Sequence, residues 1–171
     1  LRLAWLAYAE PVPVSDAAHY LNWARQLLDH GQFGHPEPTA YTLPGYPAFL
    51  ALLWWLHDSV AWLQLAQVGL AVLTAWLVAR LAARLFPGRP RVALLAAAVY
   101  ALYPAFVFSA PLFLGENLFT PLMLATLLVA LGPWPGLPAA AAAGLLLGAA
   151  MYVRGEAAAY AASEGLITQT E

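Results

Sequence analysis

The longest uncharged stretch of this chain is the feature that most constrains its fold. No Asp, Glu, Lys, Arg or His occurs from Asn117 to Val153, and a second such stretch runs from Ser59 to Val78. The 171 residues are 63% hydrophobic and only 9% charged, whereas a soluble domain has about 25% charged residues. A chain this short cannot bury so much apolar surface, because small domains bury a smaller fraction of their surface. The sequence therefore predicts an all-α membrane protein.

The charge balance and the absence of cysteine exclude several other classes. Seven arginines, no lysine and nine acidic residues give a formal net charge of −2, so the basic patch of a nucleic-acid-binding protein is missing. Without cysteine the chain has no disulfide, no thiolate metal site and no cysteine nucleophile. The apolar content is also too high for a disordered chain.

The uncharged stretches predict four membrane-spanning segments, since a spanning helix needs about 20 apolar residues. The first two are Ser59–Val78 and Val92–Gly115. The longest stretch is divided at Gly132–Pro138, where three prolines and two glycines cannot continue a helix. It therefore gives a hairpin of two short spans, Asn117–Leu131 and Ala139–Val153.

The arginines orient these spans. Four of them crowd one loop, namely Arg80, Arg84, Arg89 and Arg91. Because short cytoplasmic loops carry an excess of positive charge, this loop is expected to be cytoplasmic. The region before Ser59, the turn at Gly115–Glu116 and Arg154 then lie outside, and the loop at 132–138 lies inside.

This topology divides the chain into four parts. Residues 1–9 are expected to be the outer end of a truncated first membrane helix, in which Arg2 must snorkel or pair; the alternative is a short buried strand or loop. Residues 10–58 form an extracytoplasmic loop with juxtamembrane helices, residues 59–154 form the four-helix membrane region, and residues 155–171 are a polar tail of uncertain origin. Because the chain begins inside an apolar run without methionine, we expect the N-terminal fragment of a longer protein.

The outer loop is predicted to contain two helices. Ser15 can cap a helix that runs to His30 and stops at Gly31. Its apolar positions have helical spacing, which predicts an amphipathic helix on the membrane surface: Ala17, Tyr20, Leu21, Ala24, Leu27 and Leu28. Pro47 can open a second helix, Ala48–Leu56, which reaches only about 15 Å and so should not span the bilayer.

Three charged residues on the predicted outer face could carry chemistry. Asp16 lies in the first turn of a helix, where the dipole favours the ionised carboxylate; it could equally only stabilise that helix end. Glu116 is the single acid between Asp58 and Glu156, and acids at the membrane are costly, although it could simply cap the next span in water. Two carboxylates on one face suit general-base work or cation binding. Arg154 could bind a lipid phosphate or act as an interfacial anchor.

Histidine spacing gives only a weak metal signal. Asp16 and His19 are one helical turn apart, and His30 and His35 flank a glycine-containing turn, but two ligands do not define a site. A divalent cation held by Asp16 and Glu116 is possible, and no metal site is predicted firmly.

The order of several short motifs resembles a known family. Ser15-Asp16-Ala17-Ala18-His19-Tyr20 is followed by Pro44-Gly45-Tyr46-Pro47, by Gly115-Glu116-Asn117-Leu118-Phe119, and by a helix with Gly144 and Gly148 that closes on Arg154. Together these resemble the polyprenyl-phosphate-sugar-dependent glycosyltransferases of the GT-C fold, which are similar to protein O-mannosyltransferases and lipid A aminoarabinose transferases. The resemblance covers the chain from about Asp16 to Arg154 and rests on order and spacing, not on one motif.

The resemblance implies a function and roles for five residues. Asp16 would activate the acceptor as a base, Glu116 would be the second outer acid of the active site, and Tyr20, Tyr46 and Arg154 would bind substrate. The partners would be a polyprenyl-phosphate-linked sugar, membrane lipid and a hydroxyl-bearing protein or glycolipid acceptor. The enzyme would lie in a bacterial plasma membrane with its site facing outside. An ion-coupled transporter and a non-catalytic membrane scaffold remain the alternatives.

Overall fold

The computed structural model describes residues 1–9, 16–33, 43–133 and 136–154, and within those ranges the regular structure is entirely helical. The elements follow in order as α1 (Arg2–Ala9), α2 (Asp16–His30), α3 (Gly45–Leu56), α4 (Val60–Leu85), α5 (Pro90–Leu102), α6 (Pro104–Ser109), α7 (Glu116–Ala130) and α8 (Leu137–Val153). The predicted all-α class is therefore confirmed for the described part of the chain.

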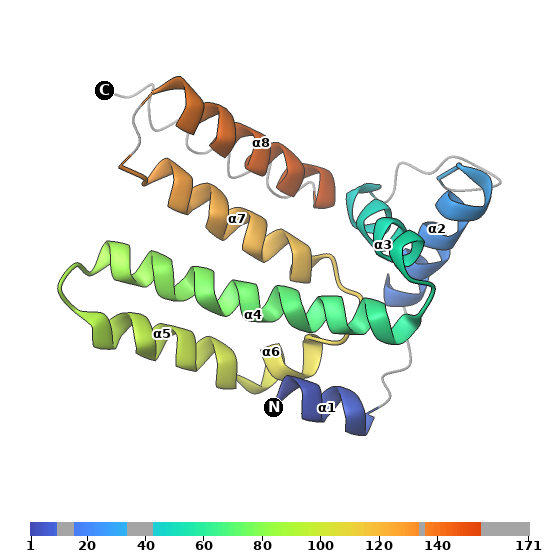
Figure 1. The fold of residues 1–171 in the computed structure, drawn as a ribbon, viewed down its shortest axis with the longest axis horizontal. Coiled ribbons are helices and arrows are strands. Elements are labelled where there is room, and N and C mark those ends of the chain that lie inside the picture. The colour runs from blue at the N-terminus through green and yellow to red at the C-terminus, as the bar shows by residue number, and fades with distance from the viewer. Residues whose placement is uncertain (10–15, 34–42, 134–135, 155–171) are drawn as a thin grey trace.

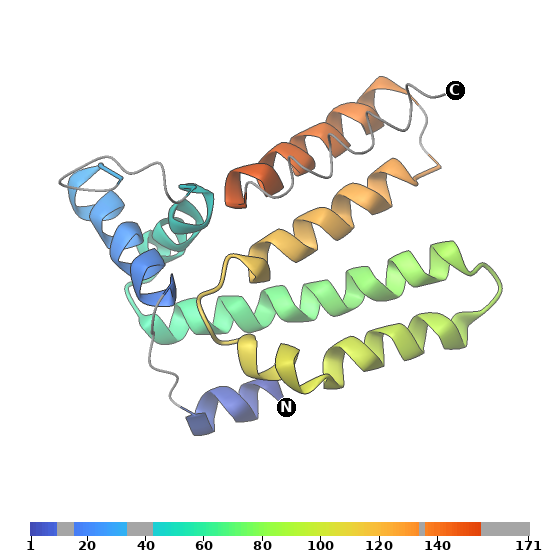
Figure 2. The ribbon, with the colours of Figure 1, turned by 180° about the vertical axis from the view of Figure 1, so that it is seen from behind.

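Four helices form an open layer. α8 packs on α7, α7 on α4 and α4 on α5, so α4 lies inside the layer (Figure 1). α4 and α7 run in one direction and α5 and α8 in the other, which places the α4–α5 and α7–α8 connections at one end of the layer. The other end carries α2 and α3, the start of α7 and the end of α8, as the view from behind also shows (Figure 2).

Glycine and proline residues end α2 and separate α7 from α8, as the sequence predicts. α2 stops at His30, and Gly31 follows with φ 64°, a left-handed conformation that glycine adopts without steric cost. The predicted hairpin is α7 followed by α8, separated by the Gly- and Pro-rich loop and packed against one another. The second loop helix begins at Gly45, so that Pro47 lies inside its first turn and does not open it. Ser15 lies outside the described residues.

The predicted span Val92–Gly115 is wrong as a continuous helix. α5 ends at Leu102, and Tyr103 is extended, with φ −62° and ψ 121°. Pro104 has no N–H and its ring disfavours the helical conformation of the residue before it, so the chain breaks there and restarts as the six-residue α6.

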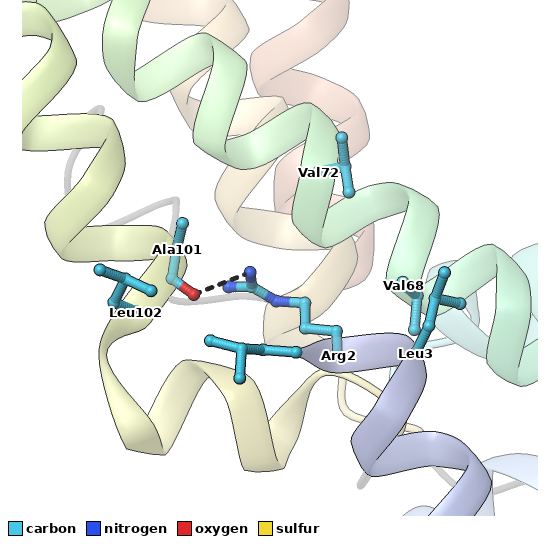
Figure 3. A pocket seen from close by; sticks show the side chains of 7 residues that line it. Arg2, Leu3, Val68, Val72, Ala101 and Leu102 are labelled. Atoms are coloured by element: carbon cyan, nitrogen blue, oxygen red, sulfur yellow. Dashed lines mark hydrogen bonds between the residues drawn. The ribbon is translucent and has the colours of Figure 1, made fainter.

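Arg2 pairs with backbone at this break. Its guanidinium donates to the carbonyls of Tyr100 and Ala101, both at 3.2 Å, and lies 5.4 Å from the centre of the Tyr100 ring. Pro104 cannot donate to the Tyr100 carbonyl, so the arginine supplies the hydrogen bond that the proline removes. A cavity of about 370 Å³ adjoins it, lined by apolar residues of α1, α4 and α5 (Figure 3).

The described helices differ in whether their length would allow them to cross a bilayer. Among the described residues, α4 with 26 residues is the one helix long and apolar enough to cross a bilayer, and α3, α5, α7 and α8 are shorter apolar helices. The predicted first span is thus one continuous helix that extends past Arg80 and Arg84 to Leu85.

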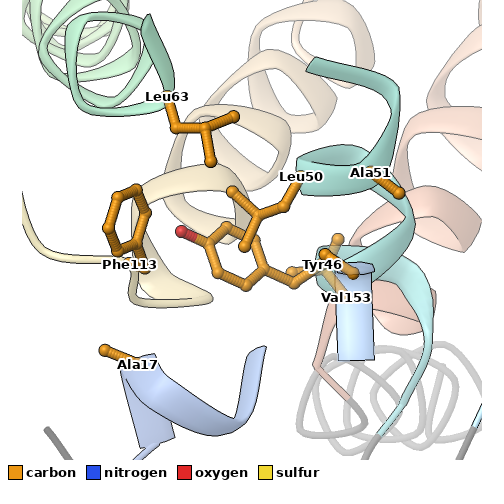
Figure 4. Close-up of a cluster of buried hydrophobic side chains, with 8 residues drawn as sticks. Ala17, Tyr46, Leu50, Ala51, Leu63, Phe113 and Val153 are labelled. Atoms are coloured by element: carbon orange, nitrogen blue, oxygen red, sulfur yellow. The ribbon is translucent and has the colours of Figure 1, made fainter. Parts of the chain in front are cut away.

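The core lies at one end of the layer, where α2 and α3 meet α4 and α8. Tyr46 and Leu50 of α3, Leu63 of α4 and Phe113 of the loop before α7 are almost fully buried there (Figure 4). The predicted apolar face of α2 packs against this cluster and against α3, because Ala17 and Ala24 are buried. The apolar face of α2 therefore packs against other side chains of the protein.

A close backbone contact fixes α3 against α8. A Cβ added at Gly45 would lie 2.6 Å from the carbonyl carbon of Tyr152 and 2.9 Å from the amide nitrogen of Val153, closer than a side chain can approach backbone. Glycine at this position therefore lets the start of α3 touch the end of α8, next to Tyr46 and Arg154.

Candidate active site

The hydroxyl group of Tyr20 is the centre of a polar cluster at the α2–α3 end of the layer. Burial raises the pKa of Tyr20 above its usual value, the carboxylates of Asp16 and Glu116 raise it further, and the nearby guanidinium of Arg154 lowers it. A Cβ added at Gly115 would lie 3.8 Å from both the Tyr20 hydroxyl and the Arg154 Cγ. The start of α7 and the residue after α8 therefore lie beside the Tyr20 hydroxyl, and Asp16 lies one helical turn before Tyr20 on α2.

Glu116 and Arg154 form an ion pair between the first residue of α7 and the residue that follows α8. Their side chains are 55% and 28% exposed, so the pair is reached by solvent and contributes little stability. It nevertheless fixes the carboxylate and the guanidinium at one place, beside Tyr20. The interpretation of Glu116 as a helix-end carboxylate is compatible with this geometry, since it also lies in the first turn of α7.

Tyr46 connects the cluster to the core. Its ring lies edge-on to that of Tyr20, with centroids 5.0 Å apart. Burial raises the pKa of Tyr46 well above its usual value, and the charges of Tyr20 and Glu116 raise it further. The hydroxyl group of Tyr46 is therefore neutral at any physiological pH and acts as a hydrogen-bond donor.

The predicted site residues do not include two polar side chains that adjoin the cluster, Gln67 of α4 and Asn117 of α7. The Gln67 carbonyl oxygen accepts hydrogen bonds from the Tyr46 hydroxyl at 3.1 Å and from the Asn117 amide at 3.3 Å. The signal available in the sequence was an amide side chain inside an apolar span, where a polar group is buried only with partners.

The residues present do not fit a metal site. Within residues 1–9, 16–33, 43–133 and 136–154 no three His, Asp or Glu side chains lie close enough to hold one ion. Glu116 is paired with Arg154, which leaves too few oxygen ligands for a hard divalent cation. His19 is exposed and its ring lies tilted against that of Trp23, with centroids 5.6 Å apart, whereas His35 lies outside the described residues.

Of the five residues that the resemblance assigns, the structure thus brings together Tyr20, Tyr46, Glu116 and Arg154, and Asp16 lies one helical turn before Tyr20 on α2. They come from α2, α3 and the two ends of the α7–α8 hairpin. No protein-family model, curated protein or solved structure matches this chain. The assignment of a function therefore rests on the chemistry of this cluster.

Proposed function

We propose that this chain is part of a membrane glycosyltransferase, which transfers a sugar from a polyprenyl-phosphate donor to a hydroxyl group of a protein or glycolipid acceptor. The observation that carries the proposal is the Glu116–Arg154 ion pair beside the Tyr20 hydroxyl, with Asp16 one helical turn before Tyr20 on α2. These groups are distant in sequence, and they supply a candidate base and a candidate phosphate-binding cation within one cluster.

The exposed surface of the helix layer supports a membrane location. Leu94 of α5, Leu137 and Leu145 of α8 are 72%, 81% and 76% exposed, and α5 has no buried residue. So many exposed leucines would make a soluble protein aggregate, whereas lipid tails cover them without cost. α4 reaches about 39 Å at 1.5 Å per residue, more than the roughly 30 Å of a hydrocarbon core. α5, α7 and α8 reach about 20–26 Å by the same rise, so they need flanking residues or a thinner bilayer.

The polar cluster suits the chemistry of glycosyl transfer at the outer surface of a bacterial plasma membrane. The Asp16 carboxylate takes the proton of the acceptor hydroxyl as its oxygen forms a bond to the anomeric carbon. The bond from that carbon to the phosphate oxygen breaks, and the electron pair leaves with the lipid phosphate. Arg154 stabilises the negative charge that develops there. Glu116 holds Arg154 in place through their ion pair.

One observation favours a transporter as the second candidate. Carriers use broken helices and charges within the bilayer, and the α5–α6 break with Arg2 buried against it has both features. The acids, however, lie at helix ends and not at the break. The two candidates therefore assign the function to different sites, which makes them separable by experiment.

Asp16→Asn in the full-length protein tests the proposal. In proteoliposomes with a radiolabelled polyprenyl-phosphate sugar, the variant should lose about 10²–10⁴-fold in transfer, because an amide cannot accept the proton. Glu116→Gln should lose less. Asp29→Asn, on the same helix and paired with Arg25, is the matched control and should transfer normally.

Two results would contradict the proposal. Transfer at the wild-type rate by Asp16→Asn would make Asp16 a helix-end carboxylate and would require another base. Accumulation of a solute inside the proteoliposomes that depends on Arg2, without sugar turnover, would favour the transporter.

A further inference from the structure

Gln67 is a polar residue in an apolar part of α4 and is completely buried. Its carbonyl oxygen accepts from Tyr46 on α3 and from Asn117 on α7, so one atom joins three helices. The amide must be oriented in this way because the Asn117 nitrogen can only donate.

Each of the two hydrogen bonds leads to the candidate active site. Tyr46 lies edge-on to Tyr20, which is the centre of the polar cluster. Asn117 follows Glu116 and also donates to the Leu112 carbonyl at 2.7 Å, which holds the loop that brings Gly115 next to Tyr20. The Gln67 oxygen thus links the α2–α3 side of the cluster to the α7–α8 side.

Stability alone does not explain a glutamine here. The Gln67 amide nitrogen is buried and has no acceptor among the residues that the structure describes. A buried N–H group without an acceptor is unfavourable, and leucine would fill nearly the same volume without one. The hydrogen bonds of the carbonyl oxygen are therefore the property that distinguishes glutamine from an apolar residue.

We propose that Gln67 is a positioning residue of the candidate active site. Its carbonyl oxygen fixes Tyr46 and Asn117 relative to one another, and this sets the spacing of Tyr20 on α2 and Glu116 on α7. The positioning is a property of the fold, whereas its effect on turnover rests on the proposed glycosyltransferase function.

A distance measurement across the cluster tests the positioning without an activity assay. The chain has no cysteine, so Asn22→Cys on α2 and Tyr152→Cys on α8, both exposed, can carry two spin labels. In lipid nanodiscs the parent and the Thr74→Val control should give one narrow distance distribution. Thr74 is the matched control because it is buried in α4 and donates only within its own helix, to Leu70.

Gln67→Leu should broaden or shift that distribution while the helical content stays unchanged. Tyr46→Phe removes a single hydroxyl group and should change the distance distribution in the same direction. This variant still tests the proposal if Gln67→Leu does not fold. Gln67→Glu keeps an oxygen acceptor in either protonation state and should restore the narrow distribution. A parent-like distribution for both Gln67→Leu and Tyr46→Phe would overturn the proposal.

Sugar turnover by the full-length protein provides the second measurement. Gln67→Leu should lower kcat about 10²-fold, as expected for reacting groups displaced by about 1 Å, whereas Thr74→Val should not. Wild-type kcat in Gln67→Leu would refute the positioning role. If no form of the protein turns over the lipid-linked sugar but the distance distribution still depends on Gln67, the proposed function fails and the positioning remains.

Discussion

The contact between the start of α3 and the end of α8 gives a prediction that can be worked out from the structure. Gly45→Ala adds one methyl group, whose carbon would lie 2.6 Å from the carbonyl carbon of Tyr152 and 2.9 Å from the amide nitrogen of Val153. These neighbours are backbone atoms of a helix and cannot rotate away. The substitution must therefore push α3 away from α8.

The expected cost lies at the upper end of the range for overpacking, about 3 kcal/mol. For a chain of this size about 2–4 °C of melting temperature corresponds to each kcal/mol, so Gly45→Ala should melt about 6–12 °C lower. Gly144→Ala is the matched control, because nothing lies within 4 Å of its added Cβ in the interior of α8. Alanine is favoured over glycine in a helix by about 1 kcal/mol, so this variant should melt about 2–4 °C higher.

Thermal unfolding in the same detergent, followed by helical circular dichroism, measures both variants. The two added methyl groups should therefore shift the melting temperature in opposite directions. If Gly45→Ala melts at or above the parent temperature, the close approach of α3 and α8 does not exist in the protein. Tyr46 and Arg154 would then no longer be held together by this contact.

Three further predictions concern topology, pH and the helix break. In membrane vesicles, Asn22→Cys should react with an impermeant reagent from the outside and Gly88→Cys should not; the reverse pattern would invert the orientation. Burial raises the pKa of Tyr46 above the usual value of 10.0, so its contribution to stability is complete below pH 10 and is lost as the pH rises further. Tyr46→Phe should accordingly lose less stability than the parent between about pH 10 and 12 in unfolding experiments; an unchanged slope would contradict this. Arg2→Met leaves the Tyr100 carbonyl without its donor and should destabilise the protein by about 1–3 kcal/mol, whereas equal stability would mean that water or lipid replaces the guanidinium.

The local elements were predictable because their causes are local. The end of α2 follows from a helical apolar pattern that meets Gly31, and the α7–α8 hairpin follows from three prolines and two glycines between apolar runs. The break between α5 and α6 was also predictable from the sequence, since Pro104 alone accounts for the extended conformation of Tyr103. The uncharged stretch by itself does not reveal the break, because one internal proline leaves the charge pattern unchanged.

The candidate site was predictable from the sequence only in part. Asp16, Glu116 and Arg154 could be selected from the sequence because isolated charges beside apolar stretches are conspicuous. Their common neighbour could not be derived in the same way, since Tyr20 of α2 meets groups from α7 and from the end of α8 only after the helices pack.

The sequence by itself determined where helices form, where most of them end and which few charges lie near their ends, because hydrophobic periodicity and the conformations of proline and glycine act over a few residues. Only the tertiary structure decided the long-range pairs. Arg2 meets a carbonyl 99 positions away and Asn117 meets Gln67 across 50 positions. Such contacts depend on the order and close approach of helices, and no local pattern encodes these because many packings bury the same apolar faces equally well.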